Sequence, residues 1–169
     1  PGQCHIPLKG VVLSPKVEVF RAGTAEGYPF LPARTVLTAI VSMAAPNCNP
    51  RMRDAPVDKP ASEKEYRRLL LQKWLATLRA CQLAGADVLV APDVGCGVYM
   101  NDPAAVGGAL GEALRTGPSA GLREVHLVGM SAFADAVEDA FEGPSVDSVG
   151  EGLCGPLTPN VCGKPTCSY

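Results

Sequence analysis

The stretch DVLVAPDVGCGVYMNDPAAVGGALGEA, residues 87–113, decides how the chain folds. Its apolar start, DVLVA, predicts a buried strand that ends at about Ala91. A loop with two glycines follows, and Asp102 and Pro103 are favoured as the N-cap and first residue of a helix. A strand, a loop and a helix in this order place backbone N–H groups beside a helix N-terminus. That arrangement favours binding of phosphate or diphosphate.

The glycine loop supplies the first candidate site residues. Gly95 and Gly97 allow positive φ and a close approach of a ligand to the backbone. Tyr99 adds an aromatic face suited to a ribose or a base. The loop is neither a Walker loop nor a full Rossmann fingerprint. The alternative is a tight strand–loop–helix turn that needs glycines for its shape and binds nothing.

Segments on either side continue the alternation of strands and helices. Further strands are predicted at 10–13 and 17–20 (two strands or one kinked strand), 36–43 (buried) and 124–130. Helices are predicted from the capping box at Ser62 to Gly85, and around Phe133 to Phe141. Loops are expected at 22–34 and 46–60. The pattern predicts an α/β fold with a sheet covered on both faces, in a domain of residues 1–142, followed by an irregular tail, 143–169.

Composition narrows the function classes. Hydrophobic residues make up 47% of the chain and charged residues 19%, which allows a buried core and excludes wholesale disorder. The net charge of −2 gives no electrostatic footprint for binding nucleic acid. No run of about 18 apolar residues is present to span a membrane. The chain has seven cysteines, an odd number, and no C-x-x-C pair. This pattern predicts scattered free thiols in an intracellular setting, cytoplasmic or nuclear. We expect neither a metal site nor a cofactor.

Three separated motifs carry a resemblance to a known family. GCGVY (95–99) is followed by NDP (101–103) after an apolar strand, LSPKVEVFR occupies 13–21, and VLTAIVSMAAPN occupies 36–47. In this order they resemble the microbial-type poly(ADP-ribose) glycohydrolases of the macro-domain superfamily, over roughly residues 10–130. The resemblance implies a macro-like three-layer α/β/α sandwich with a mixed, mostly parallel sheet.

The same resemblance implies a ligand and its contacts. The ligand would be ADP-ribose, its polymer or an ADP-ribosylated protein. The diphosphate would lie on the backbone amides of Gly95, Cys96, Gly97 and Val98, and Tyr99 would pack against the ribose. Asn47, which ends a strand on the same rim, is a further contact candidate, or else a loop cap.

The chain departs from the family in its catalytic signature. That signature is a glycine triplet followed by paired glutamates, and it precedes the strand that LSPKVEVFR resembles. Here the residues before that strand, PGQCHIPLKGVV, contain no acid, and glycosidic cleavage needs a carboxylate at the leaving oxygen. His5, near the start, and His126, within a strand, do not replace it. We therefore expect the amino-terminal part of the domain to be missing or degenerate, and no catalytic residue.

These observations favour a binding domain for ADP-ribose that is inactive as given. Hydrolase activity would require a segment upstream of Pro1. The alternative is a degenerate relative that acts as a structural or interaction module in a larger assembly. A more distant alternative is an unrelated nucleotide-binding α/β enzyme, which lacks support because the chain has no P-loop lysine.

Overall fold

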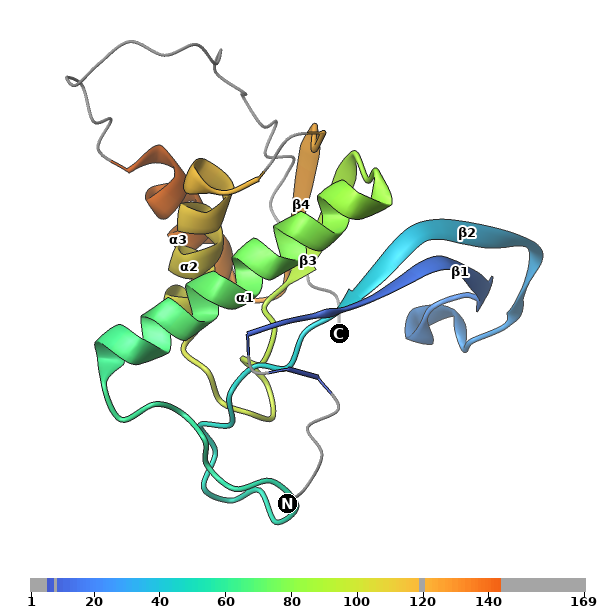
Figure 1. The fold of residues 1–169 in the computed structure, drawn as a ribbon. Helices are drawn as coiled ribbons and strands as arrows, with labels where there is room; N and C mark the ends of the chain where they lie inside the picture. Colours follow the sequence, from blue (N-terminus) through green and yellow to red (C-terminus); the bar gives the residue numbers. More distant parts are fainter. Residues whose placement is uncertain (1–5, 8, 119–120, 144–169) are drawn as a thin grey trace, which may run out of the picture.

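The computed structural model describes residues 6–7, 9–118 and 121–143 and shows a mixed α/β fold (Figure 1). This confirms the predicted α/β class, but the expected single sheet covered on both faces is not seen, because the described strands form two separate pairs. The elements follow in the order β1 Val12–Arg21, a short 3-10 helix Thr24–Glu26, β2 Phe30–Ser42, α1 Glu63–Ala84, β3 Val88–Pro92, α2 Pro103–Thr116, β4 Glu124–Val128 and α3 Ser131–Glu142. The predicted tail, except Gly143, lies outside the described residues.

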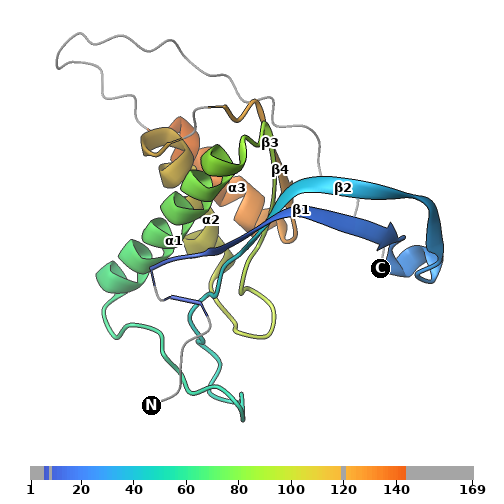
Figure 2. The ribbon, with the colours of Figure 1, turned by 45° about the vertical axis from the view of Figure 1, so that its right-hand side comes forward.

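The first two strands form an antiparallel hairpin that stands away from the helices as a long arm, as two views show (Figures 1 and 2). Its register is constant from the pair Val12–Ser42 to the pair Val19–Thr35. The predicted break at residues 14 and 15 is a kink inside one strand, where Lys16 takes a φ of 54°. Of the two expectations for this region, one kinked strand is confirmed.

Two predictions for the second strand are wrong. The expected loop at 22–34 ends early, because residues from Phe30 onward already belong to β2 and Phe30 pairs with Arg21. The expected burial of 36–43 also fails: Val36 is 59% exposed and Ile40 41% exposed. The physical reason is that β2 pairs only with β1 among the described residues, so most of the hairpin has no layer packed on it.

Helix α1 begins and ends where its capping residues predict. The Ser62 hydroxyl accepts a hydrogen bond from the Glu65 amide at 3.5 Å, and Gly85 closes the helix with a φ of 68°. The face that the helix buries carries Tyr66, Leu70, Trp74 and Leu78. No helix in the described part of the chain is long and apolar enough to cross a membrane.

The third and fourth strands pair in parallel, from Val88–Glu124 to Pro92–Val128, as the βαβ pattern around α2 predicts. Residues of β3 alternate in exposure: Ala91 is 1% exposed and lies in the core, whereas Val90 is 61% exposed. The prediction of a buried strand is therefore right for one face only. The other face of β3 is not packed against a helix within the described residues.

Helices α2 and α3 pack very closely because α2 carries glycines at the contact. A Cβ atom on Gly107 would overlap the carbonyl oxygen of Phe133, and one on Gly111 would overlap that of Val137. Small residues at such positions let two helix backbones approach. The fold thus anchors α2, whose N-terminus follows the glycine loop, on a core that also contains α1.

Candidate functional site

The loops that follow β2 and β3 meet at one edge of the molecule. The amide of Cys48 donates a hydrogen bond to the carbonyl of Tyr99 at 2.9 Å, and the side chain of Asn49 donates to the carbonyl of Val98 at 2.9 Å. The C-terminal ends of the two strands therefore lie together. In α/β folds this is the edge at which ligands bind.

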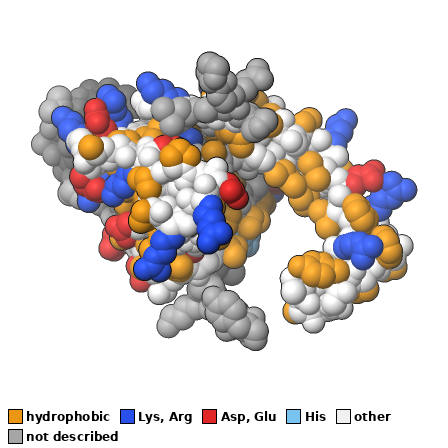
Figure 3. All heavy atoms as spheres, turned by 90° about the horizontal axis from the view of Figure 1, so that it is seen from below, with side chains coloured by type: hydrophobic (Ala, Val, Ile, Leu, Met, Phe, Trp, Pro, Cys, Tyr) orange, Lys and Arg blue, Asp and Glu red, His pale blue; other side chains and the backbone are white. Residues whose placement is uncertain are grey.

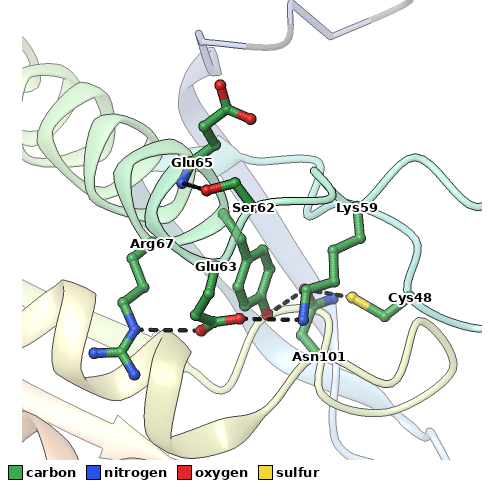
Figure 4. Close-up of polar contacts among 8 residues, drawn as sticks. Cys48, Lys59, Ser62, Glu63, Glu65, Arg67 and Asn101 are labelled. Atoms are coloured by element: carbon green, nitrogen blue, oxygen red, sulfur yellow. Dashed lines mark hydrogen bonds and ion pairs between the residues drawn. The ribbon is translucent and has the colours of Figure 1, made fainter.

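Asn101 joins the two loops through its side chain (Figure 4). It is 2% exposed. Its Nδ2 donates to the carbonyls of Pro46 at 2.9 Å and Gly95 at 3.0 Å. Its Oδ1 accepts from the Tyr66 hydroxyl at 2.9 Å and from the Cys48 thiol at 3.4 Å. One buried amide therefore fixes the loop after β2, the glycine loop and α1 relative to one another.

The two glycines of the loop have different roles. Gly95 has a φ of 81°, and a Cβ there would lie 2.7 Å from Nδ2 of Asn101, so only glycine fits. Gly97 is not among the described residues with positive φ, so only Gly95 uses the conformational freedom that both glycines allow. A Cβ on Gly97 would meet nothing within 4 Å. The fold therefore requires Gly95 and does not require Gly97.

The exposed part of the loop presents three successive amides. No hydrogen bond within the described part of the chain uses the N–H of Gly97, Val98 or Tyr99. The Cys96 amide differs, because it donates to the carbonyl of Asp93 at 3.1 Å, and the Cys96 side chain is buried. Gly97 and Val98 are exposed and Tyr99 is half-buried, so a ligand can reach this side of the loop.

Asn47 lies at the same edge, as predicted, but its side chain serves the loop around it. It is 3% exposed, and its Nδ2 donates to the carbonyls of Ala55 at 2.7 Å and Pro56 at 3.2 Å. Its Oδ1 accepts from the Asn49 amide at 2.9 Å. This arrangement matches the loop-cap alternative and leaves the side chain little capacity for a ligand.

Titratable groups beneath the loops are held in their neutral forms. Burial raises the pKa of the Cys96 thiol to about 11, with nearby Asp93 and Asp102 adding to the shift. Burial is also the largest cause that raises the pKa of Cys48 and of the Tyr66 hydroxyl. These groups therefore support the loops as neutral hydrogen-bonding partners, and the thiols are not activated nucleophiles.

Lys59 and Glu63 lie beside the buried side chain of Tyr66 at the start of α1 (Figure 4). The Lys59 ammonium lies 4.2 Å from the centre of the Tyr66 ring and 3.5 Å from Glu63, which also pairs with Arg67 at 3.2 Å. Exposed pairs of this kind contribute little stability.

Three carboxylates close to the loops accept hydrogen bonds from backbone amides. Asp58 accepts from the Asn47 amide, Asp93 accepts from the Met130 amide at 3.1 Å, and Asp102 caps α2 by accepting from Ala104 at 3.1 Å. His126 lies on β4, with its Nε2 3.5 Å from Glu124. His5 lies outside the described residues. Within the described ranges no cluster of three metal-ligating side chains occurs.

Sequence reasoning located the loop and missed the residue that organises it. Asn101 was visible only as the residue before the N-cap of α2, and Tyr66 was not singled out among the residues of α1. The NDP motif was the one signal that pointed to Asn101.

Comparison with solved structures shows that this mixed α/β fold is similar to that of microbial poly(ADP-ribose) glycohydrolases. Poly(ADP-ribose) glycohydrolase from Deinococcus radiodurans, in complex with ADP-ribose, has a TM-score of 0.59 and 23% identity, covering 78% of this chain and 52% of that one. The enzyme from Thermomonospora curvata has a TM-score of 0.59 and 28% identity, and the match covers 75% of this chain and 46% of that one. The same enzyme bound to the inhibitor ADP-HPD has a TM-score of 0.57 and 31% identity, and the match covers 74% of this chain and 48% of that one.

These comparisons confirm the resemblance to microbial poly(ADP-ribose) glycohydrolases. The chain spans about half the length of the solved structures that it matches. A scan of protein-family profiles and a search of curated proteins each found no match.

Proposed function

We propose that this chain binds ADP-ribose, free or as a unit of its polymer or of an ADP-ribosylated protein. The observation that carries the proposal is the run of open amides at Gly97, Val98 and Tyr99, next to the N-terminus of α2. Such amides suit a diphosphate, because they add hydrogen bonds to the positive end of a helix dipole. Two solved relatives support the ligand class, one bound to ADP-ribose and one to ADP-HPD.

Each predicted contact has a defined role in this proposal. Gly95 shapes the loop, and the Cys96 side chain packs beneath it, so the diphosphate lies on the amides that follow. Tyr99 offers its half-buried ring to the ribose. Asn47 holds the neighbouring loop in place: its side chain binds Ala55, Pro56 and Asn49, and its own amide and carbonyl are hydrogen-bonded to Asp58 and Lys59.

Isothermal titration calorimetry with ADP-ribose tests the proposal, with Gly97→Val as the informative variant. Because nothing lies within 4 Å of a Cβ at Gly97, valine there should fold normally and obstruct only the approach of a ligand. We expect at least a tenfold loss of affinity. Gly23→Val, on the hairpin arm with equally open space and an extended backbone, is the matched control and should bind like the parent.

Two results would contradict the proposal. One is the absence of binding by a parent chain whose cooperative thermal unfolding shows that it is folded. The other is equal binding by the parent and Gly97→Val. AMP and inorganic pyrophosphate as competitors would separate recognition of the adenosine half from recognition of the diphosphate.

We infer in addition that residues 1–169 alone bind without cleaving. Asp58, Asp93 and Asp102 each hold a backbone amide, and Glu63 is paired with Lys59 and Arg67, so none of these four carboxylates is poised as a general acid. Incubation with poly(ADP-ribose) should release no ADP-ribose above background. Release that scales with the concentration of purified chain would refute this inference.

A second candidate function, an interaction module in a larger assembly, is favoured by one observation. The hairpin arm exposes large hydrophobic side chains, including Phe20 at 52% and Phe30 at 68%, and Figure 3 shows such side chains along the arm. Exposed apolar surface of this kind is typical of protein contacts. The two functions are compatible, because the arm and the glycine loop are different parts of the molecule.

A further inference from the structure

A cleft of about 680 Å³ separates β2 from β3. Its two walls are residues 37–43, at the end of β2, and residues 86–92, around β3. Between them it is lined by side chains of α1 and by one residue after β3: Trp74, Thr77, Cys81, Ala84 and Val94. The lining is mainly apolar, with Ile40 at 41% and Val90 at 61% exposure.

Both walls are unpaired strand edges. Among the described residues the strands form two separate pairs, β1 with β2 and β3 with β4. No backbone hydrogen bond within this part of the chain joins residues 37–43 to residues 86–92. The backbone groups that point into the cleft from either side are therefore available to a third strand, and unpaired edges are templates for one.

The ends of β2 and β3 lie where the ends of two strands of one parallel sheet would lie. The hydrogen bonds between the loops after β2 and β3 show that the two strands end at the same edge, and α1 connects them as a crossover helix does. A crossover helix commonly joins parallel strands of one sheet. A strand placed between them would turn the two pairs into one five-stranded sheet, with α1 against one face.

We propose that this cleft receives an extended β-strand from polypeptide outside residues 1–169. Seven residues of each wall line the cleft, so an inserted strand of about five to seven residues would be about 17–23 Å long. It would be rich in Val, Ile and Leu, because a central strand of a covered sheet is apolar on both faces. The solved relatives have polypeptide to spare for such a strand, since this chain covers only 46–52% of their length.

The test measures binding of a synthetic strand by fluorescence anisotropy. The probe is a labelled peptide with a central Val-Leu-Val-Ile-Val run between paired lysines, and its control has proline at the central position. Proline removes a ladder hydrogen bond, so the control should bind at least tenfold more weakly. Hydrogen exchange should show new protection of backbone amides in 37–43 and 88–92 on binding.

Two matched pairs of variants locate the binding site. Ile40→Lys on β2 and Val90→Lys on β3 place a charge in the cleft, and each should weaken binding at least tenfold. Val36→Lys and Val128→Lys replace aliphatic residues of similar exposure, 59% and 49%, that do not line the cleft, and each should stay within twofold of the parent.

Several outcomes would overturn the proposal. One is no binding of the apolar peptide, and another is equal binding of its proline control. Equal effects of all four lysine variants would indicate nonspecific adsorption to exposed apolar surface. A dimer in sedimentation experiments that Ile40→Lys dissociates would show that a second copy fills the cleft. Amides of 37–43 and 88–92 already protected in the chain without peptide would show that residues of this chain fill it.

Discussion

Replacing Asn101 by alanine should separate the loops of the candidate site from each other. The change removes hydrogen bonds to Tyr66, Pro46 and Gly95, at 2.9, 2.9 and 3.0 Å, and a weaker one from the thiol of Cys48 at 3.4 Å. Each of the three stronger bonds contributes about 1 kcal/mol net, and partners left unsatisfied in a buried site add a further penalty. We expect the free energy of unfolding to fall by about 3–5 kcal/mol.

Equilibrium unfolding in urea measures this loss, with two controls in the same region. Asn49→Ala removes one exposed inter-loop hydrogen bond, to the carbonyl of Val98, together with a local turn bond, and should cost about 1 kcal/mol. Tyr66→Phe removes a single bond to Asn101 and should cost a similar amount. In the double variant the effect of Tyr66→Phe should shrink toward zero, because its partner is already absent.

The reasoning fails if Asn101→Ala costs no more than Asn49→Ala. It also fails if the effects of Asn101→Ala and Tyr66→Phe add fully, since additivity would mean that the two side chains do not interact. If Asn101→Ala is too unstable to purify, Asn101→Ser replaces it in the comparison, because the serine hydroxyl can retain part of the hydrogen-bond network. Its loss should lie between those of Asn49→Ala and the expected 3–5 kcal/mol.

Three further predictions concern stability. Gly107→Ala should destabilise the chain through overlap with α3, whereas Gly108→Ala, with open space around it, should stabilise it by about 0.5–1 kcal/mol; thermal unfolding distinguishes them. Burial raises the pKa of the Cys96 thiol to about 11, so the folded state keeps this proton at a pH above 9, where the unfolded thiol ionises. The free energy of unfolding should therefore fall between pH 9 and 11. The fall should be about 2–3 kcal/mol larger in the parent than in Cys96→Ala. Burial lowers the pKa of Lys73, so the charge of this side chain opposes folding at neutral pH and opposes it less as the pH rises toward 10.5. Lys73→Met should therefore raise the free energy of unfolding by about 1 kcal/mol at pH 7. A lower free energy of unfolding in this variant would contradict the reasoning.

The sequence predicted those elements that depend on local signals. Ser62 and Asp102 cap α1 and α2 as expected, because a cap needs only residues within one turn. The extent of β2 was not predictable in the same way, since residues from Phe30 onward become strand by pairing with β1. Burial was misjudged for Val36 and Val90, because an apolar strand does not reveal which of its faces is covered.

The candidate site was predictable as a loop and not as a network. The glycine spacing and the Asp102–Pro103 helix start are contiguous in sequence, so the strand–loop–helix unit could be recognised. The partners of Asn101 are remote: Tyr66 is 35 residues away and Pro46 is 55. Only the fold brings them together, and a single sequence carries no record of such pairings. The same limit hid the internal hydrogen bonds of Asn47.

The kink in β1 makes the two edges of the hairpin arm chemically unequal. On the outer strand Pro15 has no N–H to offer, and Lys16 departs from extended geometry with a φ of 54° and carries a charge. These features interrupt any ladder that a neighbouring chain could build along that side. The inner edge, residues 37–43, carries neither proline nor lysine. Pairing with a further strand is therefore disfavoured along the outer edge at Pro15 and Lys16 and remains open along residues 37–43, toward the body of the molecule.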